Sequence, residues 1–166
     1  NIPLSVNISP KHIQQASFAE FLARLLAQQP AGAAEFLELE VLETSAIGDI
    51  AQVADVMQAC TRLGVRFALD DFGTGYSSLT YFHRLPIAVL KIDRNFVSGM
   101  LDDIGNLDIV EGVLSLAQAL KRPVVAEGVE QLEVGMLLYS LGCPYAQGYA
   151  IARPMPEADF EHWLRQ

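Results

Sequence analysis

The stretch Phe36-Leu37-Glu38-Leu39-Glu40-Val41 alternates apolar and acidic residues over a run with strand character. Successive side chains of a strand point to opposite faces, so the leucines and Val41 share one face while Glu38 and Glu40 share the other. A strand within an open parallel sheet is covered on both faces and is usually apolar throughout. One apolar face and one acidic face instead favour a β/α barrel, whose outer surface meets helices and whose inner surface borders a site.

Six short apolar runs alternate with helical segments along the 166 residues. Because parallel strands need a crossover of about a dozen residues, this alternation predicts parallel strands covered by helices in a single α/β domain, residues 1–166. A TIM-like β/α barrel has eight strands in about 250 residues. We therefore expect an incomplete barrel with six of the eight strands. The predicted strands are residues 4–9, 36–41, 66–70, 88–93, 123–127 and 145–149.

Capping residues and a 3.6-residue period predict the helices between these strands. One helix begins at Ser9-Pro10 and continues through Leu25, and a second is capped by Asp49 and ends at Gly64. Further helices are expected over residues 104–120 and 131–141 and from Met155 onward. The predicted inward face of the helix over 104–120 carries Ile109, Val113, Leu116 and Leu120.

The composition disfavours several classes of function. A formal net charge of −9 repels polyanions, so we expect no DNA or RNA partner. No run of about 18 uncharged apolar residues occurs, so we expect no membrane contact by this chain. Cys60 and Cys143 are interpreted as buried free thiols, with a disulfide as the alternative. Free thiols fit a cytoplasmic location, in a parent protein that can still be attached to the inner membrane.

Each predicted strand ends in a polar or ionisable side chain. The strand ends of a β/α barrel converge on one mouth, so we expect these groups to gather. Crowded carboxylates need countercharge, and oxygen ligands without histidine or thiolate favour Mg²⁺ or Mn²⁺. The residues concerned are Asn7, Glu40, Glu43, Asp70, Asp71, Lys91, Asp93, Glu127, Glu130 and Gln147.

Two of these positions leave alternatives open. The adjacent Asp70 and Asp71 can hold two metals roughly 4 Å apart for an in-line phosphoryl displacement, or can cap a helix or start a turn. Lys91 can stabilise phosphate charge or orient water, or can merely pair with Asp93 or Glu127.

Other groups near the predicted site are equally open to two interpretations. The segment Gly73-Thr74-Gly75 can bind phosphate or form a turn. Tyr145 and Tyr149 can stack on a base or belong to the core, and we favour the core.

Taken in order, these segments resemble the signatures of the EAL domain family. The most specific is Asp-Asp-Phe-Gly-Thr-Gly-Tyr-Ser-Ser at residues 70–78. The resemblance extends over nearly the whole chain. The other matching segments are residues 5–9 (SVNIS), 38–45 (ELEVLETS), 90–94 (LKIDR), 126–130 (AEGVE), 146–149 (AQGY) and 153–154 (RP).

The resemblance implies a two-metal site for Mg²⁺ or Mn²⁺ and hydrolysis of cyclic di-GMP to the linear dinucleotide pGpG. It assigns Asn7, Glu40 and Asp70 to the first metal, and Asp70 and Asp71 to the second. It makes Glu127 the general base or a ligand of metal-bound water, assisted by Lys91. The residues that it implies support the substrate or the loop after Asp71 are Glu43, Asp93, Glu130, Gln147, Gly73, Thr74 and Gly75.

Two departures from the family pattern qualify the expected activity. Leu42 stands where the family commonly has threonine. The chain corresponds to the C-terminal three quarters of such a domain, so we expect the two opening strands, with the glutamate of the Glu-x-Leu motif, to lie outside it. The 166 residues alone should therefore be weakly active or inactive. The alternatives are a non-catalytic cyclic di-GMP receptor and a protein-interaction module.

The resemblance also indicates partners. We expect a homodimer with its contact near residues 72–78, and an upstream sensor or GGDEF domain in the parent protein.

Overall fold

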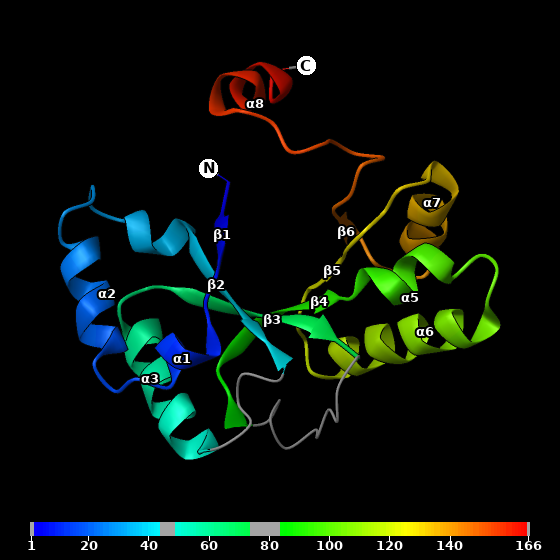
Figure 1. The fold of residues 1–166 in the computed structure, drawn as a ribbon. Coiled ribbons are helices and arrows are strands. Elements are labelled where there is room, and N and C mark those ends of the chain that lie inside the picture. Colours follow the sequence, from blue (N-terminus) through cyan, green and yellow to red (C-terminus); the bar gives the residue numbers. More distant parts are fainter. Residues whose placement is uncertain (1, 44–48, 74–83, 166) are drawn as a thin grey trace.

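The computed structural model describes residues 2–43, 49–73 and 84–165, and these form one sheet of six parallel strands flanked by helices (Figure 1). The strands follow one another across the sheet in sequence order, and every neighbouring pair is parallel. The sheet curls into a half-barrel, which confirms the predicted incomplete β/α barrel. The strands are β1 Leu4–Asn7, β2 Leu37–Leu42, β3 Arg66–Phe72, β4 Ile87–Ile92, β5 Val124–Ala126 and β6 Tyr145–Ala146.

The two faces of the sheet differ as the alternation in β2 predicts. Leu39 and Val41 are buried on the outer face, together with residues such as Phe67 and Leu90 from the next strands. Burying a side chain of this size contributes about 1.5–3 kcal/mol, so the outer face holds the helices to the sheet. The inner face carries charge instead. The buried charged residues among those described are Glu38, Glu40, Asp70, Lys91 and Asp93.

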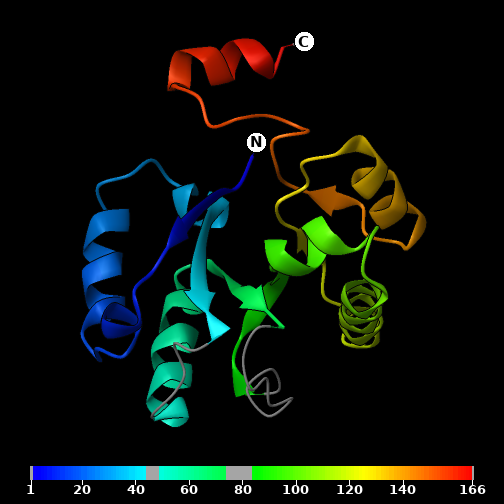
Figure 2. The ribbon, with the colours of Figure 1, turned by 45° about the vertical axis from the view of Figure 1, so that its right-hand side comes forward.

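The helices lie in two groups, with α1 to α3 on one flank of the sheet and α5 to α7 on the other (Figure 2). The last helix, α8, stands away from the sheet in both views. Within the described parts of the chain, no helix combines the length and the apolar character that a membrane span requires. The helices are α1 Pro10–Ile13, α2 Phe18–Leu26, α3 Ile50–Arg62, α5 Arg94–Gly99, α6 Ile104–Ala119, α7 Leu132–Ser140 and α8 Glu157–Trp163, with a 3-10 turn, η1, at Ala33–Phe36.

Three helical predictions need correction. The helix expected from Ser9 to Leu25 is divided into α1 and α2, with Gln14 as the C-cap of α1 and Ser17 as the N-cap of α2. The short helix α5 was not predicted, because Asp93, which caps it, was interpreted as a strand end. The inward face of α6 also differs. Its buried residues are Val110, Val113 and Ala117, while Ile109 and Leu120 are 38% and 42% exposed.

Both cysteines are buried free thiols, as predicted. Burial raises the pKa of Cys60 to about 11 because the thiolate would lose its hydration. Neither side chain faces the inner surface of the sheet that carries the charged groups: Cys60 belongs to α3, and Cys143 lies between α7 and β6.

Candidate metal and catalytic site

Lys91 joins carboxylates from three other parts of the sheet. Its Nζ lies 2.6 Å from Glu40 Oε1 on β2 and 3.6 Å from Asp70 Oδ1 on β3, and it forms an ion pair with Glu127, which directly follows β5. Lys91 and Glu40 are only 4% and 6% exposed. The pairing with Glu127 that the sequence left open is therefore present, within a larger cluster.

Lys91 keeps its positive charge in this cluster although it is buried. Burial alone would lower the pKa of Lys91, but its hydrogen bonds with Glu127 and Glu40 outweigh that effect and raise the pKa above its ordinary value. The ammonium group therefore stays charged at neutral pH. Burial raises the pKa of Glu127, and the hydrogen bond from Lys91 opposes that rise. A carboxylate with a raised pKa is a better proton acceptor, which suits Glu127 to proton transfer.

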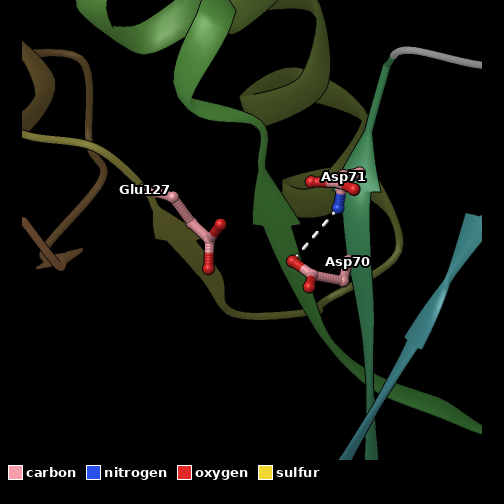
Figure 3. A group of neighbouring side chains, drawn as sticks. All are labelled: Asp70, Asp71 and Glu127. Atoms are coloured by element: carbon pink, nitrogen blue, oxygen red, sulfur yellow. Dashed lines mark hydrogen bonds between the residues drawn. The ribbon is translucent and has the colours of Figure 1, made fainter. Parts of the chain in front are cut away.

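Asp70 and Asp71 turn toward Glu127 across the mouth of the sheet (Figure 3). One carboxylate oxygen from each of these three residues lies within 4.8 Å of the other two. The pairing of β3 with β4 shifts in register between Leu69 and Phe72, and Asp71 adopts a left-handed backbone conformation with φ of 54°. The amide of Asp71 donates to Asp70 Oδ1 at 3.1 Å. This irregularity within β3 accompanies the meeting of two consecutive carboxylates at one site.

The donor set fits a hard divalent cation. Burial, a hydrogen bond with Asp93 and the negative charge of Asp70 together raise the pKa of Asp71. A rise with these causes shows excess negative charge at this point, which a cation would relieve. The donors are carboxylate oxygens, which Mg²⁺ and Mn²⁺ prefer. The cluster is therefore able to hold a metal of this class.

Other predicted residues surround the cluster. Gln147 Nε2 donates to Glu127 Oε1 at 3.1 Å, and Asp93 caps α5 by accepting from the amide of Asn95 at 2.8 Å. Asn7 lies opposite Glu40 in the register of β1 and β2 and is exposed.

The loop after Asp71 begins beside Glu43. The Gly73 amide donates to Glu43 Oε2 at 3.4 Å. Gly73 has φ of 101°, and a side chain there would meet the ring of Phe96 at 3.0 Å, so glycine suits this position on both grounds. Thr74 and Gly75 lie outside the described residues.

A half-open cavity of about 500 Å³ adjoins Glu127 and Gln147. Glu130 lies on its wall, together with Arg94, Tyr149 and Arg153. The guanidinium of Arg153 lies 4.5 Å from the centre of the Tyr149 ring. Tyr149 and Tyr145 are 54% and 57% exposed, so the prediction that they belong to the core is wrong.

Arg94 and Arg153 were not among the predicted site residues. Arg94 packs closely against the backbone at position 128. This is possible because residue 128 is glycine: a Cβ atom there would lie 2.4 Å from the Arg94 Cβ. No spacing in the sequence reveals that contact, since it depends on how the segment after β5 crosses the start of α5.

A family model described as "EAL domain" matches residues 1–154. This chain belongs to the EAL domain family. Among curated EAL relatives, cyclic di-GMP phosphodiesterase NbdA of Pseudomonas aeruginosa is 38% identical over 162 residues, covering 98% of this chain and 21% of NbdA. The probable cyclic di-GMP phosphodiesterase PdeN of Escherichia coli is 34% identical, covering 99% of this chain and 32% of PdeN. The chain thus spans a fifth to a third of these two relatives.

Solved EAL structures agree with the half-barrel. The cyclic di-GMP complex of the PaMucR phosphodiesterase has a TM-score of 0.89 and 35% identity, over 95% of this chain and 64% of that one. The EAL domain of Mycobacterium smegmatis DcpA has a TM-score of 0.90 and 35% identity, over 99% of this chain and 74% of that one. Both solved chains therefore contain further polypeptide beyond the part that matches this chain.

Proposed function

We propose that this chain supplies most of the active site of a phosphodiesterase domain that hydrolyses cyclic di-GMP to pGpG with two Mg²⁺ or Mn²⁺ ions. The observation that carries the proposal is the meeting of Glu40, Asp70, Asp71, Lys91 and Glu127 at one mouth of an EAL half-barrel. The names of the curated relatives support the same activity.

The proposed metal ligands are those that the likeness to the EAL family implies. Asn7, Glu40 and Asp70 would hold the first cation, and Asp70 and Asp71 the second. When bound, the cations would neutralise phosphodiester charge and lower the pKa of a water molecule. The oxygen-only donor set is the reason to assign Mg²⁺ or Mn²⁺ rather than Zn²⁺.

Glu127 is the proposed general base. It accepts hydrogen bonds from Lys91 and Gln147, which fix its orientation, and it faces Asp70 and Asp71 across the mouth. A proton passes from the attacking water to Glu127, a new P–O bond forms, and the bond from phosphorus to one bridging ribose oxygen breaks. The released ribose oxygen takes up a proton, which leaves a linear dinucleotide with one terminal phosphate.

The remaining predicted residues support substrate or loop. Glu43 would anchor the loop after Asp71 through the Gly73 amide, and Asp93 would restrain Asp71. The proposal also gives Glu130, Gln147, Thr74 and Gly75 a role in supporting the substrate or the loop. We also propose a cytoplasmic homodimer whose parent carries an upstream sensor or GGDEF domain.

The test measures pGpG production from cyclic di-GMP by a domain extended upstream to complete the barrel. Asp70→Asn should abolish turnover with either metal, and chelation by EDTA should do the same to the parent domain. Asp55→Asn is the matched control, because Asp55 is an exposed carboxylate on α3 on the outer surface. Tight binding of cyclic di-GMP without hydrolysis would support the receptor alternative. A domain that neither binds nor hydrolyses cyclic di-GMP would contradict both the phosphodiesterase proposal and the receptor alternative.

A further inference from the structure

Gly73 is held from two sides at the point where the chain leaves β3. On one side, its amide donates to Glu43 Oε2 at 3.4 Å. On the other side lies the ring of Phe96 from α5, so close that a Cβ atom at position 73 would be 3.0 Å from Phe96 Cε2. The same atom would be 3.8 Å from Ile109 Cγ2 on α6. Gly73 therefore lies between a carboxylate and an apolar support.

Phe96 belongs to the first turn of α5, which contacts the same stretch of chain at a second point. Asp93, the N-cap of α5, forms a hydrogen bond with Asp71. Phe96 follows three residues later, is partly buried and packs against the hydrophobic core. The start of α5 thus contacts the end of β3 both at Asp71 and at Gly73. A helix anchored in the core is a rigid base for such contacts.

The backbone from Asp71 to Gly73 needs support of this kind because it is irregular. Asp71 and Gly73 both have positive φ, 54° and 101°, and the pairing of β3 with β4 shifts in register before Phe72. An unusual backbone conformation persists only where the surrounding contacts fix it. The N–H···O distance of 3.4 Å between Gly73 and Glu43 is longer than the usual range of about 2.7–3.2 Å, so this contact alone fixes Gly73 weakly.

We propose that Phe96 is a positioning residue for the Asp71 carboxylate. Its ring supports Gly73, keeps the Gly73 amide within reach of Glu43 and thereby holds Asp71 facing Glu127. The inference deepens the proposed function and rests on it, since Asp71 is the proposed ligand of the second cation. Phe96 acts through Gly73 and not through the substrate. An error of about 1 Å in the position of a reacting or ligating group can cost about a hundredfold in rate, so an apolar side chain can have this role.

Mn²⁺ titrations and steady-state kinetics on the upstream-extended domain test the proposal. Phe96→Ala should lower both the affinity for the second Mn²⁺ and kcat about tenfold, with KM nearly unchanged. Phe96→Leu keeps much of the apolar volume but removes the ring edge nearest Gly73, so it should show a smaller loss of both. Phe18→Ala is the matched control: Phe18 is a buried phenylalanine of α2, so its loss destabilises the fold but should leave Mn²⁺ affinity and kcat unchanged.

A double variant separates a positioning role from a general loss of packing. Phe96→Ala and Glu43→Ala both act on Gly73, so their effects should overlap and not multiply. The double variant should fall no more than about twofold below Glu43→Ala alone in kcat. Circular dichroism checks folding, and Phe96→Leu takes the place of Phe96→Ala throughout if the latter does not fold.

Three results would overturn the role of Phe96. They are wild-type Mn²⁺ affinity in the Phe96 variants, losses that multiply in the double variant, and an equal loss of Mn²⁺ affinity in Phe18→Ala. Failure of the proposed function gives a different result. If the extended domain binds Mn²⁺ but does not hydrolyse cyclic di-GMP, the phosphodiesterase proposal fails, while the Mn²⁺ affinities of the variants still decide whether Phe96 positions Asp71. A domain that binds no Mn²⁺ contradicts both.

Discussion

Lys91 is, among the described residues, the one positive charge that the acidic side chains of the cluster share. Its single positive charge is shared among Glu40, Glu127 and Asp70 at a place where water is nearly excluded. Removing one partner of a buried ion pair leaves the others uncompensated, which costs far more than breaking a pair in water. The same lysine forms an ion pair with Glu127, the proposed general base, so its structural and proposed chemical roles overlap.

We therefore predict that Lys91→Met lowers the free energy of unfolding by about 3–5 kcal/mol in EDTA. Mn²⁺ should restore more of that stability in the variant than it adds to wild type, because the cation replaces the lost positive charge. Urea unfolding with and without Mn²⁺ measures both effects. Arg165→Met is the control: its ion pair with Glu161 is exposed, so the loss should stay below about 1 kcal/mol. Equal losses in the two variants would contradict this view of the cluster.

Cys60 allows a pH prediction away from the site. Its pKa is raised from 9.0 to about 11 in the folded protein, so the unfolded chain releases the thiol proton first. The resulting stability is fully present below pH 9 and is lost as the pH rises toward 11. Cys60→Ala should be less stable at neutral pH yet lose less further stability between pH 9 and 11. Parallel pH profiles for the two proteins would show that the thiol does not titrate in this way.

Among the elements, strands were more predictable than helices. Alternation in a strand has a period of two and separates the charged inner face from the apolar outer face without ambiguity, as in β2. Residues 104–120 are apolar on nearly every side, so periodicity alone does not select the buried face of α6. The register shift at Asp70–Asp71 could not be predicted from the sequence either, because it depends on how β3 pairs with β4.

The N-cap of α3 gives a stability prediction that leaves the site intact. Asp49 Oδ1 accepts from the amides of Ala51 and Gln52 at 3.0 and 3.1 Å. Asp49→Ala should lower the free energy of unfolding by about 1 kcal/mol. Asp49→Ser should retain most of that stability, because serine is also a good N-cap residue. Chemical denaturation measures the difference. A change in Mn²⁺ affinity in Asp49→Ala would argue against a purely local effect.

The contact between Glu43 and Gly73 gives a prediction about the loop after β3. In the completed domain, Glu43→Ala should reduce turnover about ten- to a hundredfold, the equivalent of a charged hydrogen bond of about 1.5–3 kcal/mol. Glu43→Gln keeps an acceptor oxygen and should retain more activity. Steady-state kinetics, with folding checked by circular dichroism, compare the three proteins. Wild-type turnover in Glu43→Ala would remove this residue from the mechanism.

At the scale of the whole molecule, β1 and β6 form the two edges of the described sheet. All four residues of β1 are exposed, including Leu4 at 68%. An edge strand offers unpaired backbone groups, and here it also offers apolar side chains. The EAL relatives whose structures extend beyond this chain have further polypeptide to place against such edges.

We predict that the 166 residues alone hydrolyse cyclic di-GMP poorly or not at all, whereas the upstream-extended domain is active with Mg²⁺ or Mn²⁺. We expect the extension to supply a further carboxylate ligand and to close the barrel, so metal affinity should rise as well. Turnover assays and Mn²⁺ titrations on the two polypeptides, side by side, measure this. Equal rates would show that neither the extra ligand nor closure is needed.

The Lys91–Glu40 ion pair joins residues 51 positions apart in the sequence. Lys91 also reaches forward to Glu127, so no local stretch of chain contains the site. Contacts between residues so far apart in the sequence form late and slowly in folding, because the entropy of closing a long loop is lost before the contact stabilises the chain. A partly folded chain can hold single helices such as α3 or α6, but it cannot hold the charge cluster. Catalytic competence should therefore appear only in the last, cooperative step of folding.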